Sequence, residues 1–181
     1  MTCIVGWAEK DNVWIGGDSA GVAGYSLTQR ADEKVFKKGE FIFGFTSSFR
    51  MGQLIRYKLD IPRMEEGQDI DDFLHTKFLD SIIHCFKANQ FARLENNEIK
   101  GGTFLFGFRG RLYQVEGDFQ IGKQYFNFDA VGCGQDIALG CLFGLSKTTI
   151  MRPEDRLMVA LEAAETYSAG VRKPFHIVSL K

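Results

Sequence analysis

The 181-residue sequence lacks several features that mark secreted, metal-binding or nucleic-acid-binding proteins. Its four cysteines form no Cys-x-x-Cys pair, so neither a disulfide framework nor a structural zinc site is expected. Its three histidines have no partner motif, and we expect no metal and no cofactor. The net charge is −1 and long runs of one sign are missing, which argues against nucleic acid and anionic membranes as partners.

Long apolar runs are missing as well. No stretch reaches the roughly 18 apolar residues that a membrane span needs, and the first residues lack the basic and apolar segments of a secretory signal. We therefore expect a soluble, cytoplasmic protein. Because 45% of the residues are hydrophobic, residues 1–181 are expected to fold as a single domain with a substantial core.

What the sequence does contain begins with a predicted β-hairpin. The segments 2–8 and 13–18 are apolar and β-prone, and a polar turn separates them. If the turn is centred on Lys10, antiparallel pairing sets Thr2 opposite Asp18. A hydroxyl near the start of the chain should therefore face a carboxylate.

A second hairpin is predicted from residues 34–37 and 41–44, joined by residues 38–40 with the turn at Gly39. The same pairing rule sets Lys34 opposite Gly44. Lys34 should then stand at an open strand end.

The remaining pattern predicts two helices, a group of strands, two further helices and a last strand. These elements are expected at residues 48–59, 69–89, 103–108, 111–115, 119–121, 125–131, 135–145, 153–166 and 175–180. Several strands are apolar on both faces, as in sheets that are covered on both sides. We therefore predict an α+β fold, a four-layer αββα sandwich of two stacked antiparallel sheets between helix layers.

The spacing of Thr2, Asp18 and Lys34 resembles that of the N-terminal-nucleophile (Ntn) hydrolases. The chain is similar to proteasome β-type subunits and to HslV-like threonine peptidases, and this resemblance implies the same four-layer fold. The matching segments run in family order over most of the chain: Thr2-Cys3-Ile4-Val5, Gly17-Asp18-Ser19, Lys34-Val35-Phe36, Gly44-Phe45-Thr46-Ser47-Ser48 and Gly132-Cys133-Gly134.

The resemblance implies that Thr2 is the nucleophile once Met1 has been removed. A threonine hydroxyl needs a base, and the free α-amino group of the same residue can serve as one. A nearby Lys34 cation favours the neutral, basic form of that amine, and Asp18 would orient Lys34. A retained Met1 would leave the site latent.

Two further positions complete the implied catalytic set, and both depart from the family. Ser48 would offer its backbone N–H to the oxyanion, with the bulky Phe49 beside it narrowing the substrate groove. Cys133 stands where a family serine helps to position the amine, and a thiol is a weaker partner. Tyr167 and Gly170 fall where the family carries an aspartate and a serine.

The resemblance also implies a substrate pocket and partners. The residues expected around the substrate side chain form a mixed pocket without a dominant charge: Ala20, Gly21, Val22, Asp32, Phe36 and Thr46. A ring-like homo-oligomer acting on peptide or unfolded-protein substrates is implied, and the HslV likeness adds an ATPase unfoldase partner.

Other functions are compatible with the same residues. A catalytically silent structural subunit would retain Met1 and form no acyl-enzyme, and an amidase for small amides would leave its sites open. Cys3 would be the nucleophile if two residues were removed, but this breaks the spacing to Asp18.

Overall fold

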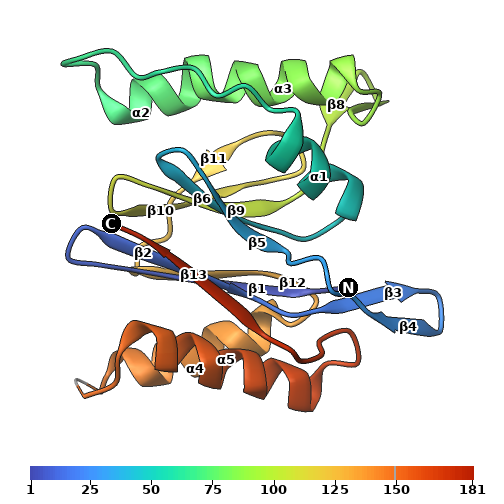
Figure 1. Ribbon diagram of the computed structural model, residues 1–181, viewed down its shortest axis with the longest axis vertical. Coiled ribbons are helices and arrows are strands. Elements are labelled where there is room, and N and C mark those ends of the chain that lie inside the picture. Colours follow the sequence, from blue (N-terminus) through green and yellow to red (C-terminus); the bar gives the residue numbers. More distant parts are fainter. Residues whose placement is uncertain (149) are drawn as a thin grey trace.

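The computed structural model describes residues 1–148 and 150–181 and has four layers (Figure 1). Two antiparallel sheets, of four and five strands, face each other in the middle, and helices cover the outer face of each sheet. This arrangement confirms the predicted αββα sandwich, and the predicted order of helices and strands is confirmed with it.

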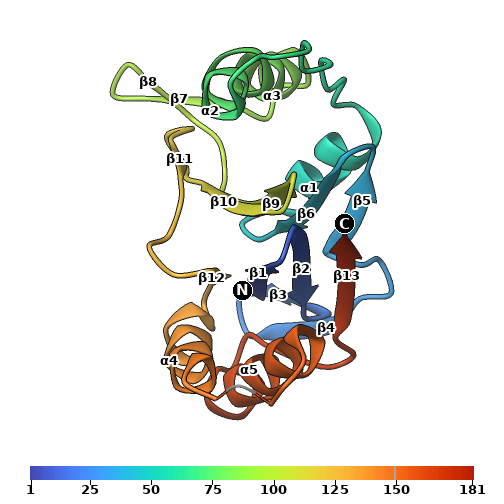
Figure 2. The same ribbon diagram turned by 90° about the vertical axis from the view of Figure 1, so that its left-hand side faces the viewer.

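The four-stranded sheet has the strand order β12-β1-β2-β13. Its strands are β1 (Cys3–Glu9), β2 (Asn12–Gly17), β12 (Phe128–Gly132) and β13 (His176–Leu180). Helices α4 (Gln135–Ser146) and α5 (Pro153–Tyr167) cover its outer face (Figure 2). Apolar residues of the two helices pack with Val5 and Trp7 of β1, which fixes the strand that follows Thr2.

The five-stranded sheet has the strand order β11-β10-β9-β6-β5. Its strands are β5 (Val35–Lys38), β6 (Phe41–Phe45), β9 (Phe104–Phe108), β10 (Arg111–Val115) and β11 (Ile121–Gly122). Its cover is α1 (Phe49–Tyr57), then α2 (Ile70–Phe73), a π-helical turn (Leu74–Phe78) and α3 (Leu79–Ala88). The core between them is rich in phenylalanine, with Phe41 stacked on Phe108 at 4.3 Å between ring centroids.

Two small hairpins lie outside the main sheets and were not predicted. They are β3 (Ala20–Ala23) with β4 (Ser26–Gln29), and β7 (Arg93–Glu95) with β8 (Glu98–Lys100). Their strands have only three or four residues, and β4 and β7 are exposed along their whole length, so the segments show no apolar alternation. The β3–β4 hairpin extends beside the N-terminus (Figure 1).

The first predicted hairpin forms, but its predicted register is wrong by one residue. Its turn consists of Lys10 and Asp11, which have φ values of 50° and 63°. Two-residue turns with positive φ at both positions match the twist of the strands, so the turn centre falls between two residues. The Asp18 N–H donates to the Cys3 carbonyl at 3.3 Å, and Asp18 therefore lies opposite Cys3 rather than Thr2.

The second hairpin shows the same one-residue error. Val35, rather than Lys34, pairs with Gly44, and the Phe45 N–H donates to the Lys34 carbonyl at 3.1 Å. The turn again has two residues and begins at Gly39, whose φ is 57°. Lys34 still stands just before β5, at the open end of the hairpin.

The helix predictions hold closely, and two strand predictions were too long. Helix α1 begins after Ser48, whose Oγ accepts the Arg50 N–H at 3.1 Å, and α2 begins after Asp69. The strand predicted at 119–121 is only Ile121–Gly122, and the one predicted at 125–131 begins at Phe128. Within the described ranges, no helix is both long and apolar enough to cross a membrane.

Candidate active site

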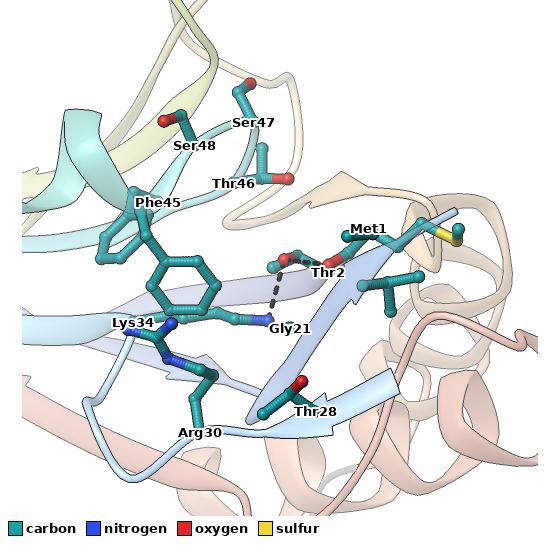
Figure 3. Close-up of a pocket in the computed structure, with 13 residues that line it drawn as sticks. Met1, Thr2, Gly21, Thr28, Arg30, Lys34, Phe45, Thr46, Ser47 and Ser48 are labelled. Carbon is teal, nitrogen blue, oxygen red and sulfur yellow. Dashed lines mark hydrogen bonds between the residues drawn. The ribbon is translucent and has the colours of Figure 1, made fainter. Parts of the chain in front are cut away.

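Thr2, Asp18 and Lys34 meet in space although they come from separate strand ends. Lys34 Nζ lies 2.8 Å from Thr2 Oγ1 (Figure 3). It also lies 2.8 Å from Asp18 Oδ1. The three residues are 5%, 1% and 1% exposed, respectively. The structure therefore brings together the three residues that the sequence spacing had linked.

Backbone N–H groups hold the Asp18 carboxylate in place. Its Oδ1 accepts from the Cys3 N–H at 3.0 Å, and its Oδ2 accepts from the N–H groups of Ala20 at 2.9 Å and Arg172 at 3.2 Å. Hydrogen bonds to an ionised carboxylate are stronger than those between neutral groups. Asp18 is thus a fixed negative charge against which Lys34 is aligned. Arg172 was not among the predicted site residues, since a backbone donor leaves no side-chain signal.

The Lys34 ammonium lies in a largely dry environment. Burial lowers the pKa of Lys34, and the charge of Asp18 acts in the opposite direction. The Phe49 ring centroid lies 5.7 Å from Lys34 Nζ and helps to exclude water from it. Because screening is weak in such surroundings, Lys34 acts strongly on the Thr2 oxygen.

The Thr2 nitrogen is an amide in this chain because Met1 is attached to it. Its N–H donates to Cys133 Sγ at 3.3 Å, and the Thr2 hydroxyl donates to the Met1 carbonyl at 2.5 Å (Figure 3). An amide nitrogen has no basic lone pair. With Met1 in place, the nitrogen therefore cannot take a proton from the Thr2 hydroxyl.

The surroundings of Cys133 differ from the expectation at 167 and 170. Tyr167 is 78% exposed, whereas the Ser168 hydroxyl lies 3.5 Å from Cys133 Sγ. A Cβ atom at Gly170 would lie 2.3 Å from Met1 Cβ and 2.7 Å from Cys133 Sγ, so glycine makes room for Met1. Ser168 is one residue away from the position that the resemblance indicated, which is why sequence reasoning missed it.

Ser48 is oriented differently from the prediction. Its N–H donates to the Thr46 carbonyl at 2.6 Å, and Ser47 between them has a φ of 62°. The Ser48 side chain caps helix α1 through the Arg50 N–H. In this arrangement the Ser48 N–H is engaged within the turn and is not a free donor for an oxyanion.

A cavity of about 250 Å³ opens beside Thr2 (Figure 3). Gly21, Val22 and Thr46, three of the predicted substrate-contacting residues, line it. Sequence reasoning missed Arg30, which also lines it and whose guanidinium carbon lies 4.3 Å from the Phe49 ring centroid. The β3–β4 hairpin brings Gly21 and Val22 to the cavity, Arg30 follows β4 directly, and Thr46 follows β6. The hairpin had no sequence signal.

The other three predicted pocket residues do not line this cavity. Ala20 is fully buried, and its N–H holds Asp18. Phe36 belongs to the core, where its ring stacks on Phe43 at 5.5 Å between centroids. The Asp32 carboxylate is occupied by the Arg30 guanidinium at 2.6 Å. The family resemblance implied these residues for the pocket, but in the structure they have other partners.

Cys3 is poorly suited to be the nucleophile. Its thiol is fully buried, and burial is the main reason that the pKa of Cys3 is raised far above its ordinary value. A thiol is nucleophilic as a thiolate, which this environment suppresses. The structure therefore disfavours the alternative in which two residues are removed.

Comparisons with known proteins give structural matches only, because no protein-family model and no curated protein matches the sequence. BPH of Thiobacillus denitrificans matches with a TM-score of 0.81 and 14% identity over 99% of this chain and 98% of that chain. Its structure in complex with epoxomicin also gives a TM-score of 0.81, at 15% identity over the same shares of the two chains. Eukaryotic HslV from Trypanosoma brucei matches with a TM-score of 0.72 and 16% identity over 99% of both chains.

The chain has a proteasome-like Ntn-hydrolase fold. A third solved protein, the Anbu (Gly-1) mutant from Hyphomicrobium sp. strain MC1, matches with a TM-score of 0.69 and 15% identity. That match covers 98% of this chain and 80% of that chain. At such identities the likeness concerns the Ntn-hydrolase fold, and the chemistry has to be argued from the residues of this chain.

Proposed function

We propose that this chain is a threonine-type endopeptidase subunit, with Thr2 as the N-terminal nucleophile after removal of Met1. The observation that carries the proposal is the position of Lys34 Nζ, 2.8 Å from both Thr2 Oγ1 and Asp18 Oδ1 in a buried site. A strand-end threonine with a structural role alone has no need of a desolvated lysine at its hydroxyl.

In the proposed reaction, the free Thr2 amine takes the hydroxyl proton while Oγ attacks the substrate carbonyl carbon. Lys34 stabilises the oxygen as it loses its proton, and Asp18 holds Lys34 in position. The peptide C–N bond then breaks, and the Thr2 amine passes the proton to the departing nitrogen. Water releases the acyl group from Thr2 by the reverse sequence of proton transfers.

We also propose that the subunit works in a ring-like homo-oligomer on peptide or unfolded-protein substrates in the cytoplasm. The likeness to HslV and BPH supports this assembly, and the HslV likeness supports an ATPase unfoldase partner.

The test is the intact mass of untagged protein before and after incubation with epoxomicin, the compound bound in one of the BPH structures. We expect loss of Met1 and a single adduct on Thr2. The adduct should disappear in Thr2→Ala and persist in Thr28→Ala, which changes another residue of the same cavity. Folded protein that lacks Met1 and forms no adduct would overturn the proposal.

A silent structural subunit is the second candidate, and one observation favours it. The Ser48 N–H is bonded to the Thr46 carbonyl at 2.6 Å, so the predicted oxyanion donor is occupied. This candidate predicts retained Met1 in natively expressed protein and no adduct. The same mass measurement therefore separates the two functions.

A further inference from the structure

A second cavity, of about 720 Å³, adjoins the first one. The two share Met1, Thr46 and Ser47 as lining residues. The second cavity is also lined by Cys133, whose Sγ lies 3.3 Å from the Thr2 nitrogen, whereas the first is lined by Lys34. The Thr2 nitrogen is thus bonded to Cys133 of the second cavity, and the Thr2 hydroxyl is bonded to Lys34 of the first.

The two cavities differ in the charged side chains that line them. The first is lined by Arg30 and Lys34 and by no carboxylate among its described residues. The second is lined by the carboxylates of Glu116, Asp129 and Asp136, and its described lining includes no lysine or arginine. Arg30 and Lys34 are each paired with a carboxylate, Asp32 and Asp18, so the distinguishing charge is that of the second cavity's carboxylates.

Asp129 is the buried member of the carboxylate set. It is 2% exposed, and its Oδ1 accepts the Ala130 N–H at 2.8 Å. None of the ion pairs within the described ranges includes it, and burial raises the pKa of Asp129 to about 6. A buried carboxylate without a cation is costly, which leaves it suited to a cation brought by a ligand.

The chemistry of an N-terminal nucleophile fixes which part of a substrate lies on this side. The departing nitrogen must receive its proton from the Thr2 amine, so it has to lie next to that amine. The Thr2 nitrogen faces Cys133, which lines the second cavity. The residue that follows the scissile bond is therefore directed toward the carboxylates.

We propose that the carboxylate-lined cavity formed by Glu116, Asp129 and Asp136 binds the leaving-group side of a peptide and selects a lysine or arginine directly after the scissile bond. This inference rests on the proposed function. The covalent steps are unchanged: the Oγ–C bond forms, the C–N bond breaks, and the amine that departs carries the cationic side chain.

The test uses Met1-free protein and peptides that are identical up to the scissile bond, followed by arginine, alanine or glutamate. We expect kcat/KM for arginine to exceed that for glutamate by tenfold or more at pH 7.5. The ratio should rise between pH 5 and pH 7.5 as Asp129 ionises. Because the ratio compares two peptides on one protein, a general loss of activity cancels.

Two substitutions remove charges from the cavity. Asp129→Asn and Glu116→Gln should each lower the ratio several-fold, and Asp129→Asn should flatten its pH dependence. If Asp129→Asn does not fold, Glu116→Gln is used for the test, because the Glu116 side chain is only half-buried. Asp118→Asn is the matched control, since the Asp118 carboxylate is exposed and lies outside the cavity. The arginine-to-glutamate ratio of this variant should equal that of the wild type.

The outcomes separate the two proposals. Epoxomicin adducts on Thr2 with an arginine-to-glutamate ratio near one would overturn the inference and leave the peptidase function standing. A ratio that both substitutions leave unchanged would also overturn the inference. Met1-free protein with neither adduct nor cleavage would overturn the proposed function itself.

Discussion

Lys34 is 1% exposed, and its only carboxylate partner within the described ranges is Asp18. Taking two charges out of water is expensive, and an apolar pair of similar volume is often as stable or more stable. Stability alone therefore does not account for the ion pair. The ion pair instead positions the Lys34 ammonium group 2.8 Å from the Thr2 hydroxyl oxygen.

Removing the charge of Asp18 should be costly, because its carboxylate accepts from Lys34 and from three backbone N–H groups. We expect Asp18→Asn to lower the free energy of unfolding by about 3 to 5 kcal/mol, measured by denaturant titration. Asp32→Asn is the control: its exposed ion pair with Arg30 should be worth about 1 kcal/mol or less. Similar losses in the two variants would contradict this account of Asp18.

Asp129 makes stability depend on pH in a defined direction. Its pKa rises from 3.8 to about 6 on folding, so the folded state binds the proton more tightly. The contribution of Asp129 to the free energy of unfolding is therefore most favourable below pH 3.8 and is lost as the pH rises through about 6. Asp129→Asn avoids this loss, and relative to the wild type it should gain about 2 to 3 kcal/mol between pH 4 and pH 8.

Thermal melts of wild type and Asp129→Asn across this pH range provide the measurement. A constant difference in Tm between the two proteins would show that Asp129 does not titrate as its burial requires.

At the scale of elements, helix α1 and strand β6 fit closely because of a glycine. A Cβ atom at Gly52 would lie 2.1 Å from Cε1 of Phe45, a residue that also lines the cavity beside Thr2. We expect Gly52→Ala to destabilise the protein by about 1 to 3 kcal/mol and to slow epoxomicin labelling. Chemical denaturation and labelling kinetics measure the two effects.

Gly140 in α4 supplies the matched control, since a Cβ atom there would meet no atom within 4 Å. Gly140→Ala should stabilise the helix by about 0.5 to 1 kcal/mol. If neither substitution changed the free energy of unfolding, the close approach of α1 to the sheet would not contribute to stability.

The elements also show what the sequence could predict. Apolar periodicity located the helices and the main strands, because burial imposes it on both. It did not reveal the turn geometry: the positive φ values at Lys10 and Asp11 shift the first hairpin by one residue from its predicted register. The site survives this error because Asp18 reaches the Cys3 N–H and Lys34 together.

At the scale of the whole molecule, layers were predictable and cavities were not. Strands that are apolar on both faces require two covered sheets, so the four layers followed from the pattern. The carboxylate-lined cavity joins Glu116, which follows β10, Asp129 of β12 and Asp136 of α4, and these residues share no sequence motif. The β3–β4 hairpin was missed because its strands are short and largely exposed.

Unequal burial predicts unequal local stability across the layers. Strands β6 and β9 are buried along their whole length and pair with each other, whereas every residue of β4 and β7 is exposed. In hydrogen exchange measured by mass spectrometry, we expect the slowest amide exchange in β6 and β9 and the fastest in β4 and β7. Equal protection of these strands would contradict this ranking.

The hydrogen bond from the Arg172 N–H to Asp18 has a consequence for synthesis of the chain. A ribosome makes Thr2 early and Arg172 long afterwards. Until that later segment docks, the carboxylate that aligns Lys34 lacks one of its backbone donors. In the proposed peptidase, a nascent chain would therefore carry Thr2 without a finished active site, and the order of synthesis would help to protect neighbouring proteins.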